Sequence, residues 1–197
     1  KTKILMLNSP SNPTGSIYSR DELLAIGEVL KGTDIIVLSD EMYEKIMYNG
    51  KKFTAAAEVS EDMYKRTVTI NGLSKAVAMT GWRFGYIATC DTALAKALTK
   101  LQGQVTSNIN TMTQYAAIPA LNGDADETIE MMRVEFEKRK NIAVASFNDI
   151  KSLSTIDPDG AFYLFVNIQE VTNDSMKSCS DFLEHKGAAL VLGFAFG

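Results

Sequence analysis

The chain has few of the residues that build metal centres, disulfide frameworks or catalytic triads. Its 197 residues include two cysteines and one histidine. Cys90 and Cys179 are far apart and lack zinc-ligand spacing, and His185 alone cannot complete a triad or a His-rich metal site. The sequence therefore predicts no metal site. Scarce cysteine also favours a reducing compartment, so we expect a cytoplasmic protein.

The sequence also lacks a dominant charge and a long apolar run. Its formal net charge is −4 with mixed signs, so no electrostatic footprint for nucleic acid or an anionic membrane is present. No stretch approaches the roughly 18 apolar residues of a membrane-spanning helix, and no signal peptide opens the chain. With 46% hydrophobic residues, the composition predicts a soluble globular protein of one or two domains.

Several common catalytic motifs are missing as well. There is no Gly-x-Gly-x-x-Gly loop, no Walker loop and no Ser-x-x-Lys, and the run from Gly72 to Ala76 misses the nucleophile-elbow pattern at its last position. Internal repeats are also absent. The chain begins with Lys1 inside a strand-like run, so we interpret it as a piece of a longer protein.

The apolar run Lys3–Leu7 predicts a strand buried on both faces of a parallel sheet, and Asp34–Asp40 predicts the next buried strand. A turn rich in proline follows the first run and presents Asn12 at the carboxyl end of the strand. Asp40 ends the second run, and Tyr43 follows it. Open α/β sheets bind ligands at this edge. The alternatives are a plain turn asparagine and an aspartate that only caps the following segment.

A segment from Asn71 to Tyr86 places Lys75 among small and apolar residues and Arg83 shortly after it. A lysine near another cation in apolar surroundings loses part of its proton affinity, and its neutral amine can attack carbonyls to form a Schiff base. The guanidinium fork of an arginine fits phosphate oxygens. An isolated lysine is usually exposed, so this pairing by itself does not establish a site.

Four motifs, taken in order, favour a ligand site over ordinary turn, capping and surface residues. They are Asn-Pro-Thr-Gly at Asn12, Asp-x-x-Tyr at Asp40, Ser-Lys at Lys75, and Met-Thr-Gly-Trp-Arg ending at Arg83. Together they resemble the class I (fold type I) pyridoxal-phosphate aminotransferases, the aspartate aminotransferase group. The run Pro-x-Gly-Ala-Phe-Tyr, starting at Pro158, resembles the same family. The resemblance covers essentially the whole chain.

The resemblance implies a role for each motif residue. Lys75 would carry the Schiff base with pyridoxal 5'-phosphate and later move the substrate proton. Asp40 would keep the pyridine nitrogen protonated, and Tyr43 would lie beside the phenolic oxygen. Asn12 would bind that oxygen and the substrate α-carboxylate, and the peptide bond after it is often cis in the family. Arg83 would hold the phosphate.

The fold that the resemblance implies is α/β, with a mainly parallel sheet, one antiparallel strand and helices on both faces. The short link between the strands Thr67–Ile70 and Arg83–Thr89 also requires an antiparallel strand, since a parallel crossover needs more residues. We expect residues 1–123 to be part of a large cofactor domain, 124–149 a linking helix, and 150–197 part of a small C-terminal domain.

Further elements are predicted within this frame. Ser19 and Glu22 form a capping box at the start of a crossover helix. Trp82 should be a packing anchor, and the cluster Lys138-Arg139-Lys140 should form a solvated face of the linking helix. The C-terminal part should contain the strands Ala161–Val166 and Ala188–Leu192.

Two departures from the family are visible. Gly72 replaces a frequent hydroxyl residue three positions before Lys75, and Phe194 stands where a serine is usual. The family's N-terminal half and its late substrate-binding arginine are missing, since no arginine follows Arg139. We therefore expect the chain alone to bind the cofactor weakly and to be inactive.

For the full-length enzyme the resemblance implies a homodimer that transaminates an L-amino acid with a 2-oxo acid, aspartate and 2-oxoglutarate by default. Two alternatives stay open. One is another reaction on the same cofactor, such as a β-lyase or a cyclopropane-forming synthase. The other is a non-catalytic, effector-binding module of a transcription regulator.

Overall fold

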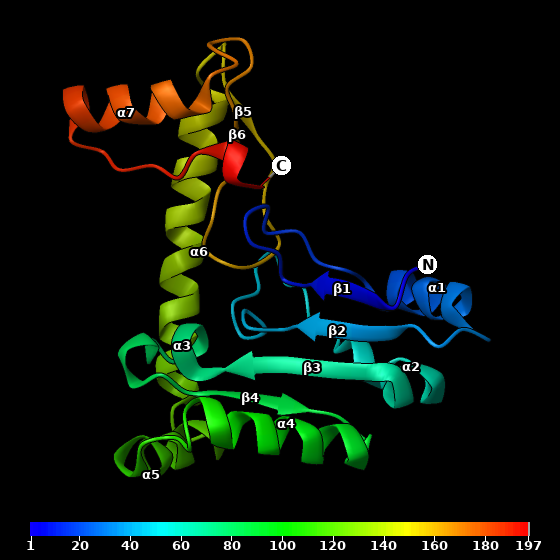
Figure 1. Cartoon of the computed structure of the whole chain (residues 1–197). Helices are drawn as coiled ribbons and strands as arrows, with labels where there is room; N and C mark the ends of the chain where they lie inside the picture. The colour runs from blue at the N-terminus through cyan, green and yellow to red at the C-terminus, as the bar shows by residue number, and fades with distance from the viewer. Residues whose placement is uncertain (197) are drawn as a thin grey trace.

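A four-stranded sheet organises the N-terminal part of the chain (Figure 1). The computed structural model describes residues 1–196. Strands β1 (Ile4–Asn8), β2 (Ile36–Asp40) and β3 (Thr67–Gly72) are parallel, and β4 (Gly85–Ala88) is antiparallel to β3. The predicted mainly parallel sheet with one antiparallel strand is confirmed. The link from β3 to β4 is too short for a parallel crossover, which explains the reversal.

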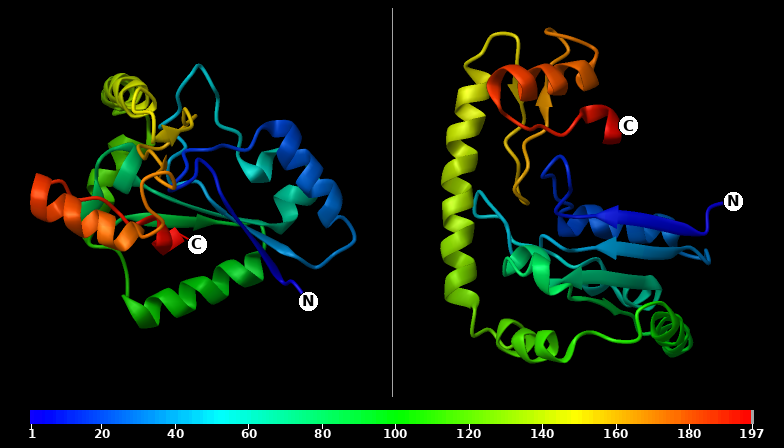
Figure 2. Two further views of the ribbon diagram at one scale, coloured as in Figure 1. Left: turned by 90° about the horizontal axis from the view of Figure 1, so that it is seen from above. Right: turned by 60° about the vertical axis from the view of Figure 1, so that its left-hand side comes forward.

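Three helices on one side of the sheet bury its main core. They are α1 (Arg20–Leu30), the short 3₁₀ helix η1 (Ala56–Glu58) and α2 (Glu61–Arg66). The core under them consists of Leu7, Leu23, Leu30, Val37, Ala56, Val59 and Met63. Helix α4 (Thr92–Val105) lies on the opposite side of the sheet (Figure 2), so the prediction of helices on both faces is confirmed.

The start of α1 follows its sequence signal closely. Ser19 Oγ accepts a hydrogen bond from the Glu22 amide, and the Glu22 carboxylate accepts one from the Ser19 amide at 2.8 Å. The predicted capping box is therefore confirmed. These bonds satisfy amide groups that have no partner inside the helix.

The prediction that the first strand is buried on both faces is wrong for this chain. Ile4 and Met6 are 55% and 75% exposed, and Ile36 beside them is 40% exposed. Side chains of a strand alternate between faces, so these three share the face opposite α1. No element within residues 1–196 covers that face at β1, because α4 lies beside β4 (Figure 1).

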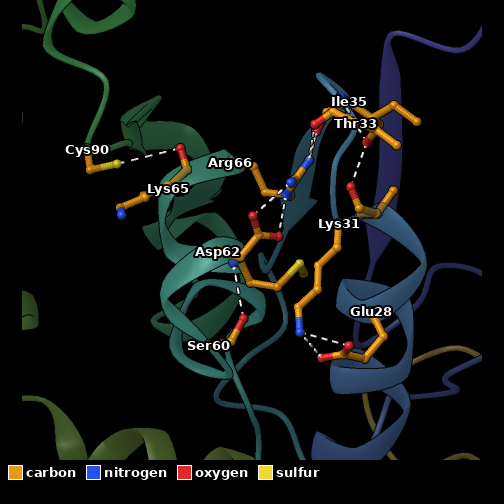
Figure 3. Close-up of polar contacts among 11 residues, drawn as sticks. Glu28, Lys31, Thr33, Ile35, Ser60, Asp62, Lys65, Arg66 and Cys90 are labelled. Atoms are coloured by element: carbon orange, nitrogen blue, oxygen red, sulfur yellow. Dashed lines mark hydrogen bonds and ion pairs between the residues drawn. The ribbon is translucent and has the colours of Figure 1, made fainter.

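Arg66 ties α2 to the beginning of β2 (Figure 3). Its Nη1 donates to the carbonyl oxygens of Thr33 and Ile35 at 3.1 and 2.8 Å, while Nε donates to Asp62 Oδ2 at 2.8 Å. Charge-assisted hydrogen bonds of this kind are among the stronger ones in proteins. The guanidinium thus fixes the position of β2, the strand that ends in Asp40.

Helix α6 (Asp126–Asn148) follows α5 (Thr111–Leu121) and runs past the carboxyl ends of β1, β2 and β3 (Figure 1). It leads to a small C-terminal unit of two short strands, one α-helix and one 3₁₀ helix. That unit contains β5 (Ser154–Thr155), β6 (Val166–Asn167), α7 (Ser175–Lys186) and the 3₁₀ helix η3 (Gly193–Phe196). No helix within residues 1–196 is long and apolar enough to cross a membrane.

Three local predictions, two in this unit and one at Trp82, are wrong. Only the end of the expected strand Ala161–Val166 is a strand, and Ala188–Leu192 has no regular structure. A strand needs a partner for its backbone hydrogen bonds, and none lies beside Ala188–Leu192 in the part of the chain that the structure describes. Trp82 is 47% exposed and is not a packing anchor.

Candidate active site

The carboxyl ends of three neighbouring parallel strands bring the predicted site segments to one edge of the sheet. Asn8 at the end of β1 pairs in register with Asp40 at the end of β2, which pairs with Ile70 near the end of β3. The turn that holds Asn12 and the turn that holds Tyr43 therefore start side by side. The segment that carries Lys75 begins at the same edge (Figure 1).

Lys75 lies in α3 (Leu73–Ala76), a single helical turn that starts directly after β3. Its Nζ is 6.0 Å from the centre of the Tyr43 ring and 5.6 Å from that of Phe162. Within residues 1–196 this nitrogen makes no hydrogen bond or ion pair with the protein. A half-buried amine over two aromatic rings, without a polar partner, is available to a ligand.

Tyr43 is the most buried of the predicted site residues, with 5% of its surface exposed. Its hydroxyl is 2.6 Å from the hydroxyl of Tyr163, and the two rings meet edge to face. Burial, followed by the hydrogen bond with Tyr163, raises the pKa of Tyr43 well above its usual value. Tyr43 is therefore a neutral hydrogen-bonding phenol.

Asp40 and Asn12 use their local turns differently. Asp40 Oδ1 accepts a hydrogen bond from the Met42 amide at 3.1 Å, as the capping alternative anticipates, but residues 41–46 form turns and no helix. The Asn12 amide donates to Asn8 Oδ1 at 2.8 Å, and the Asn12–Pro13 bond is cis. Asn12 is exposed, and its side chain makes no hydrogen bond within residues 1–196.

Arg83 lies at the same edge of the sheet because it precedes β4, the strand that runs antiparallel to the others. Gly85 pairs with Gly72 in the antiparallel register, so Arg83 precedes β4 beside the end of β3. Arg83 has a left-handed backbone with φ 56° at the end of the 3₁₀ helix η2 (Thr80–Trp82). Its Nη1 donates to the Thr80 carbonyl at 2.9 Å, and the side chain is exposed.

The structure explains why glycine stands at position 72. A Cβ atom there would lie 2.7 Å from the Phe84 carbonyl oxygen and 3.1 Å from Gly85 Cα. Both neighbours are backbone, so they cannot rotate away. In this arrangement position 72 cannot hold the hydroxyl residue that is frequent in the family, because β3 and β4 approach too closely.

The segment that follows Asp157 inserts between the turns after β1 and β2. The amides of Gly160 and Ala161 donate to the carbonyl oxygens of Gly15 and Ile46, both at 3.0 Å, and the Tyr48 amide donates to Asp159 at 2.9 Å. This backbone contact carries Phe162 and Tyr163 to Lys75. The family motif that contains them was a visible signal, but sequence reasoning assigned them no role.

Lys140 of α6 anchors this insertion and corrects the predicted solvated face. Only 4% of its side chain is exposed. Its Nζ donates to Asp157 Oδ1 at 2.5 Å and to Asn49 Oδ1 at 2.9 Å, and it lies 5.7 Å from the centre of the Tyr48 ring. The neighbouring Lys138 and Arg139 are exposed as expected, because only the side of α6 that carries Lys140 faces the turns.

A second buried ionisable group supports the end of β2. Glu41 is 3% exposed, and its Oε1 accepts hydrogen bonds from Ser39 Oγ at 2.8 Å and from the Ala56 amide at 3.2 Å. Burial raises the pKa of Glu41, and these two bonds oppose that rise. Glu41 thus links the end of β2 to the first residue of η1.

The groups at this edge suit a small phosphorylated carbonyl compound. An amine, a carboxylate, a phenol, an amide and a guanidinium come from adjacent strand ends, and they could hold an aldehyde, a ring nitrogen, a phenolic oxygen and a phosphate. Among them, Lys75 and Tyr43 come together, with Nζ 6.0 Å from the centre of the Tyr43 ring. Within residues 1–196, no hydrogen bond or ion pair joins Asn12, Asp40 or Arg83 to Lys75. The donor set fits pyridoxal phosphate, and no cluster in this part of the chain fits a metal ion.

This combination of fold and side chains defines an α/β protein with the groups for amine–carbonyl chemistry. The chain belongs to the family "Aminotransferase class I and II", whose model matches residues 1–197.

Similar proteins agree with this assignment. Over the whole chain, it is 45% identical to an aspartate aminotransferase of Bacillus subtilis and 44% identical to an asparagine–oxo-acid transaminase of Streptococcus mutans, and it covers 51% of each. Among solved structures, an aspartate aminotransferase from Rhizobium meliloti matches with a TM-score of 0.92 at 36% identity, covering 100% of this chain and 51% of that one. An aromatic aminotransferase from Pyrococcus horikoshii matches with a TM-score of 0.94 at 36% identity, covering 100% and 52%. The chain thus spans about half the length of the relatives it matches.

Proposed function

We propose that the full-length protein containing this chain transfers an amino group between an L-amino acid and a 2-oxo acid, with pyridoxal phosphate as cofactor. Aspartate and 2-oxoglutarate are the proposed substrate pair. The observation that carries the proposal is the Lys75 amine, which lies over the Tyr43 and Phe162 rings without a polar partner in residues 1–196. The names of the relatives, aspartate aminotransferase above all, support the reaction and the amino donor.

Each residue of the strand-end edge has a proposed part in holding the cofactor. When bound, pyridoxal phosphate supplies an electron sink for negative charge on the amino acid's α-carbon. The aldehyde would be held by Lys75, the ring nitrogen by Asp40 and the phosphate by Arg83. Tyr43 and Asn12 would hold the phenolic oxygen.

The chain's own side chains would then perform the remaining work. Lys75 Nζ, once neutral and free, is a base that would take the proton from the substrate α-carbon and deliver it to C4′, the aldehyde carbon of the cofactor. The amide of Asn12 orients the substrate carboxylate by hydrogen bonding. The Tyr43 and Phe162 rings limit the access of water to Lys75 Nζ, which keeps the amine beside apolar surface.

The organisation of the full-length protein is part of the same proposal. Residues 1–123 would belong to the large cofactor domain, 124–149 to the linking helix and 150–197 to the small C-terminal domain. Exposed apolar side chains of α5, among them Met112 at 71% and Tyr115 at 72%, support a homodimer. The two free cysteines are compatible with the proposed cytoplasmic location.

A lysine substitution tests the proposal. The full-length protein with pyridoxal phosphate should show a visible absorbance band that borohydride fixes to the protein, and it should consume aspartate with 2-oxoglutarate. Lys75→Ala should abolish both the fixed label and turnover. Lys65→Ala, at an exposed lysine of α2, is the matched control and should retain both. Labelling that survives in Lys75→Ala would refute the proposal.

An amino-donor screen on the same protein distinguishes aspartate from asparagine and aromatic donors. We also expect the 197-residue chain alone to bind pyridoxal phosphate weakly and not to turn over. The exposed face of β1 and the matched length, about half of each relative, support this expectation.

A further inference from the structure

Tyr163 is the only protein group in residues 1–196 that hydrogen-bonds the Tyr43 hydroxyl, and it comes from a segment 120 residues further along the chain. The oxygen atoms are 2.6 Å apart, a short distance for two neutral hydroxyls. The rings are 5.7 Å apart and nearly perpendicular, and Phe162 packs edge to face on Tyr43 at 5.3 Å. The pair therefore belongs to a tight aromatic cluster.

The backbone holds Tyr163 in this place independently of its hydroxyl. Ala161 is completely buried, and its amide donates to the Ile46 carbonyl at 3.0 Å. Met47 and Gly160 form a β-bridge. Tyr163→Phe therefore removes the hydroxyl contact while the segment stays anchored to the turn that carries Tyr43.

The number of protons available determines which of the two hydroxyls, Tyr43 or Tyr163, donates the hydrogen bond between them. A phenol has one proton to donate and can accept at least one hydrogen bond. If a ligand oxygen beside Lys75 accepts the proton of Tyr43, the short contact can be kept only when Tyr163 donates to the Tyr43 oxygen. Such a chain of two hydroxyls polarises the outer one and strengthens its bond to the ligand.

Resting on the proposed function, we propose that Tyr163 is a positioning residue for Tyr43. The Tyr163 hydroxyl donates a hydrogen bond to the Tyr43 oxygen, and this bond directs the Tyr43 proton toward an anionic oxygen of the ligand beside Lys75. The titratable groups that face Tyr43 in residues 1–196 are Tyr163, Asp40 and Lys75. Tyr163 acts through Tyr43 and has no separate contact with the ligand.

The first test is a pH titration of the visible absorbance of the full-length protein loaded with pyridoxal phosphate. A hydrogen bond donated to an anionic oxygen favours the deprotonated form, so losing it raises the pH midpoint. Tyr43→Phe should raise the midpoint by about 1 pH unit and Tyr163→Phe by a few tenths of a unit. The double variant should match Tyr43→Phe alone. Tyr64→Phe, at a tyrosine that is 56% exposed, is the control and should leave the midpoint unchanged.

The second test needs no cofactor. In the apo full-length protein labelled with carbon-13 at tyrosine Cζ, Tyr163→Phe should shift the Tyr43 resonance, and Tyr64→Phe should not. An unchanged Tyr43 resonance, an unchanged midpoint in Tyr163→Phe, or a Tyr163 shift that adds fully to that of Tyr43 would overturn the inference. A wild-type protein without a visible band would instead overturn the proposed function and the ligand-directed part of this inference, while the resonance shift still decides whether the pair exists.

Discussion

Because Lys140 is buried, we expect the two partners of its ion pair with Asp157 to differ in how much stability is lost when each is replaced. The Lys140 side chain is 4% exposed, whereas that of Asp157 is 52% exposed. Asp157→Ala leaves a buried ammonium with only the Asn49 oxygen and the Tyr48 ring. Removing one partner of a buried pair costs about 3–5 kcal/mol, and we expect about 3 kcal/mol because water reaches Asp157.

Lys140→Met should cost less than Asp157→Ala. It retains the apolar stem, removes the buried charge and leaves a carboxylate that solvent can hydrate. We expect a loss of about 1–2 kcal/mol from the lost charge-assisted hydrogen bonds. The order of the two variants, and not only their size, follows from which partner is buried.

Native-state hydrogen exchange in the full-length protein measures the local loss of stability in each variant. The Tyr48 and Ala161 amides bridge the two turns that Lys140 holds. Their exchange should accelerate on the order of a hundredfold in Asp157→Ala and about tenfold in Lys140→Met, because about 1.4 kcal/mol corresponds to a tenfold change. Lys138→Met, with an exposed side chain on the same helix, should change it by less than about twofold. Equal effects of the two variants, or the reverse order, would contradict a dominant role for the buried charge.

Three further substitutions test other parts of the structure. Gly72→Ala should destabilise the protein by about 1–3 kcal/mol, because the new Cβ meets backbone, whereas Gly81→Ala, with nothing near its Cβ position, should not; thermal unfolding compares them. Glu41 has a folded pKa above its unfolded pKa, so its contribution favours folding at low pH and is lost as pH rises through the folded pKa. Glu41→Gln should therefore flatten the decline of the unfolding temperature as pH rises from the unfolded pKa through the folded pKa, and an unchanged pH profile would contradict this. Arg66→Met should lower the free energy of unfolding by about 2 kcal/mol, checked by denaturant titration, and no change would show that the guanidinium contacts are dispensable.

Local signals predicted much of the fold. The Ser19 capping box, the strand ending in Asp40 and the antiparallel β4 each depend on a few neighbouring residues, and all three were predicted correctly. The expected burial of β1 on both faces failed at Met6 because hydrophobic sequence reports what a strand can bury, not whether a covering element lies in the same chain.

For the candidate site, the sequence indicated individual residues but not the contacts between distant segments. Motifs located Lys75 and Tyr43, which the structure brings together, but pairings such as Tyr43 with Tyr163 or Lys140 with Asp157 join distant segments and have no sequence period. Lys140 belongs to a run of three basic residues, which usually indicates a solvated face. Only the direction of α6 relative to the turns distinguishes it from its neighbours.

The contact of Gly160 with the two turns constrains how this protein can be changed. A Cβ on Gly160 would lie 2.7 Å from Pro10 Cβ and 2.9 Å from the Ile46 carbonyl oxygen, and one on Gly15 would clash with Pro158 Cβ. The turn after β1, the turn after β2 and the segment after Asp157 therefore pack too closely for any one of them to change its backbone path alone. Chimeras that exchange one loop with a homologue should misassemble, whereas those that transfer all three loops together should keep their fit, and protein engineering at this edge should treat them as a single module.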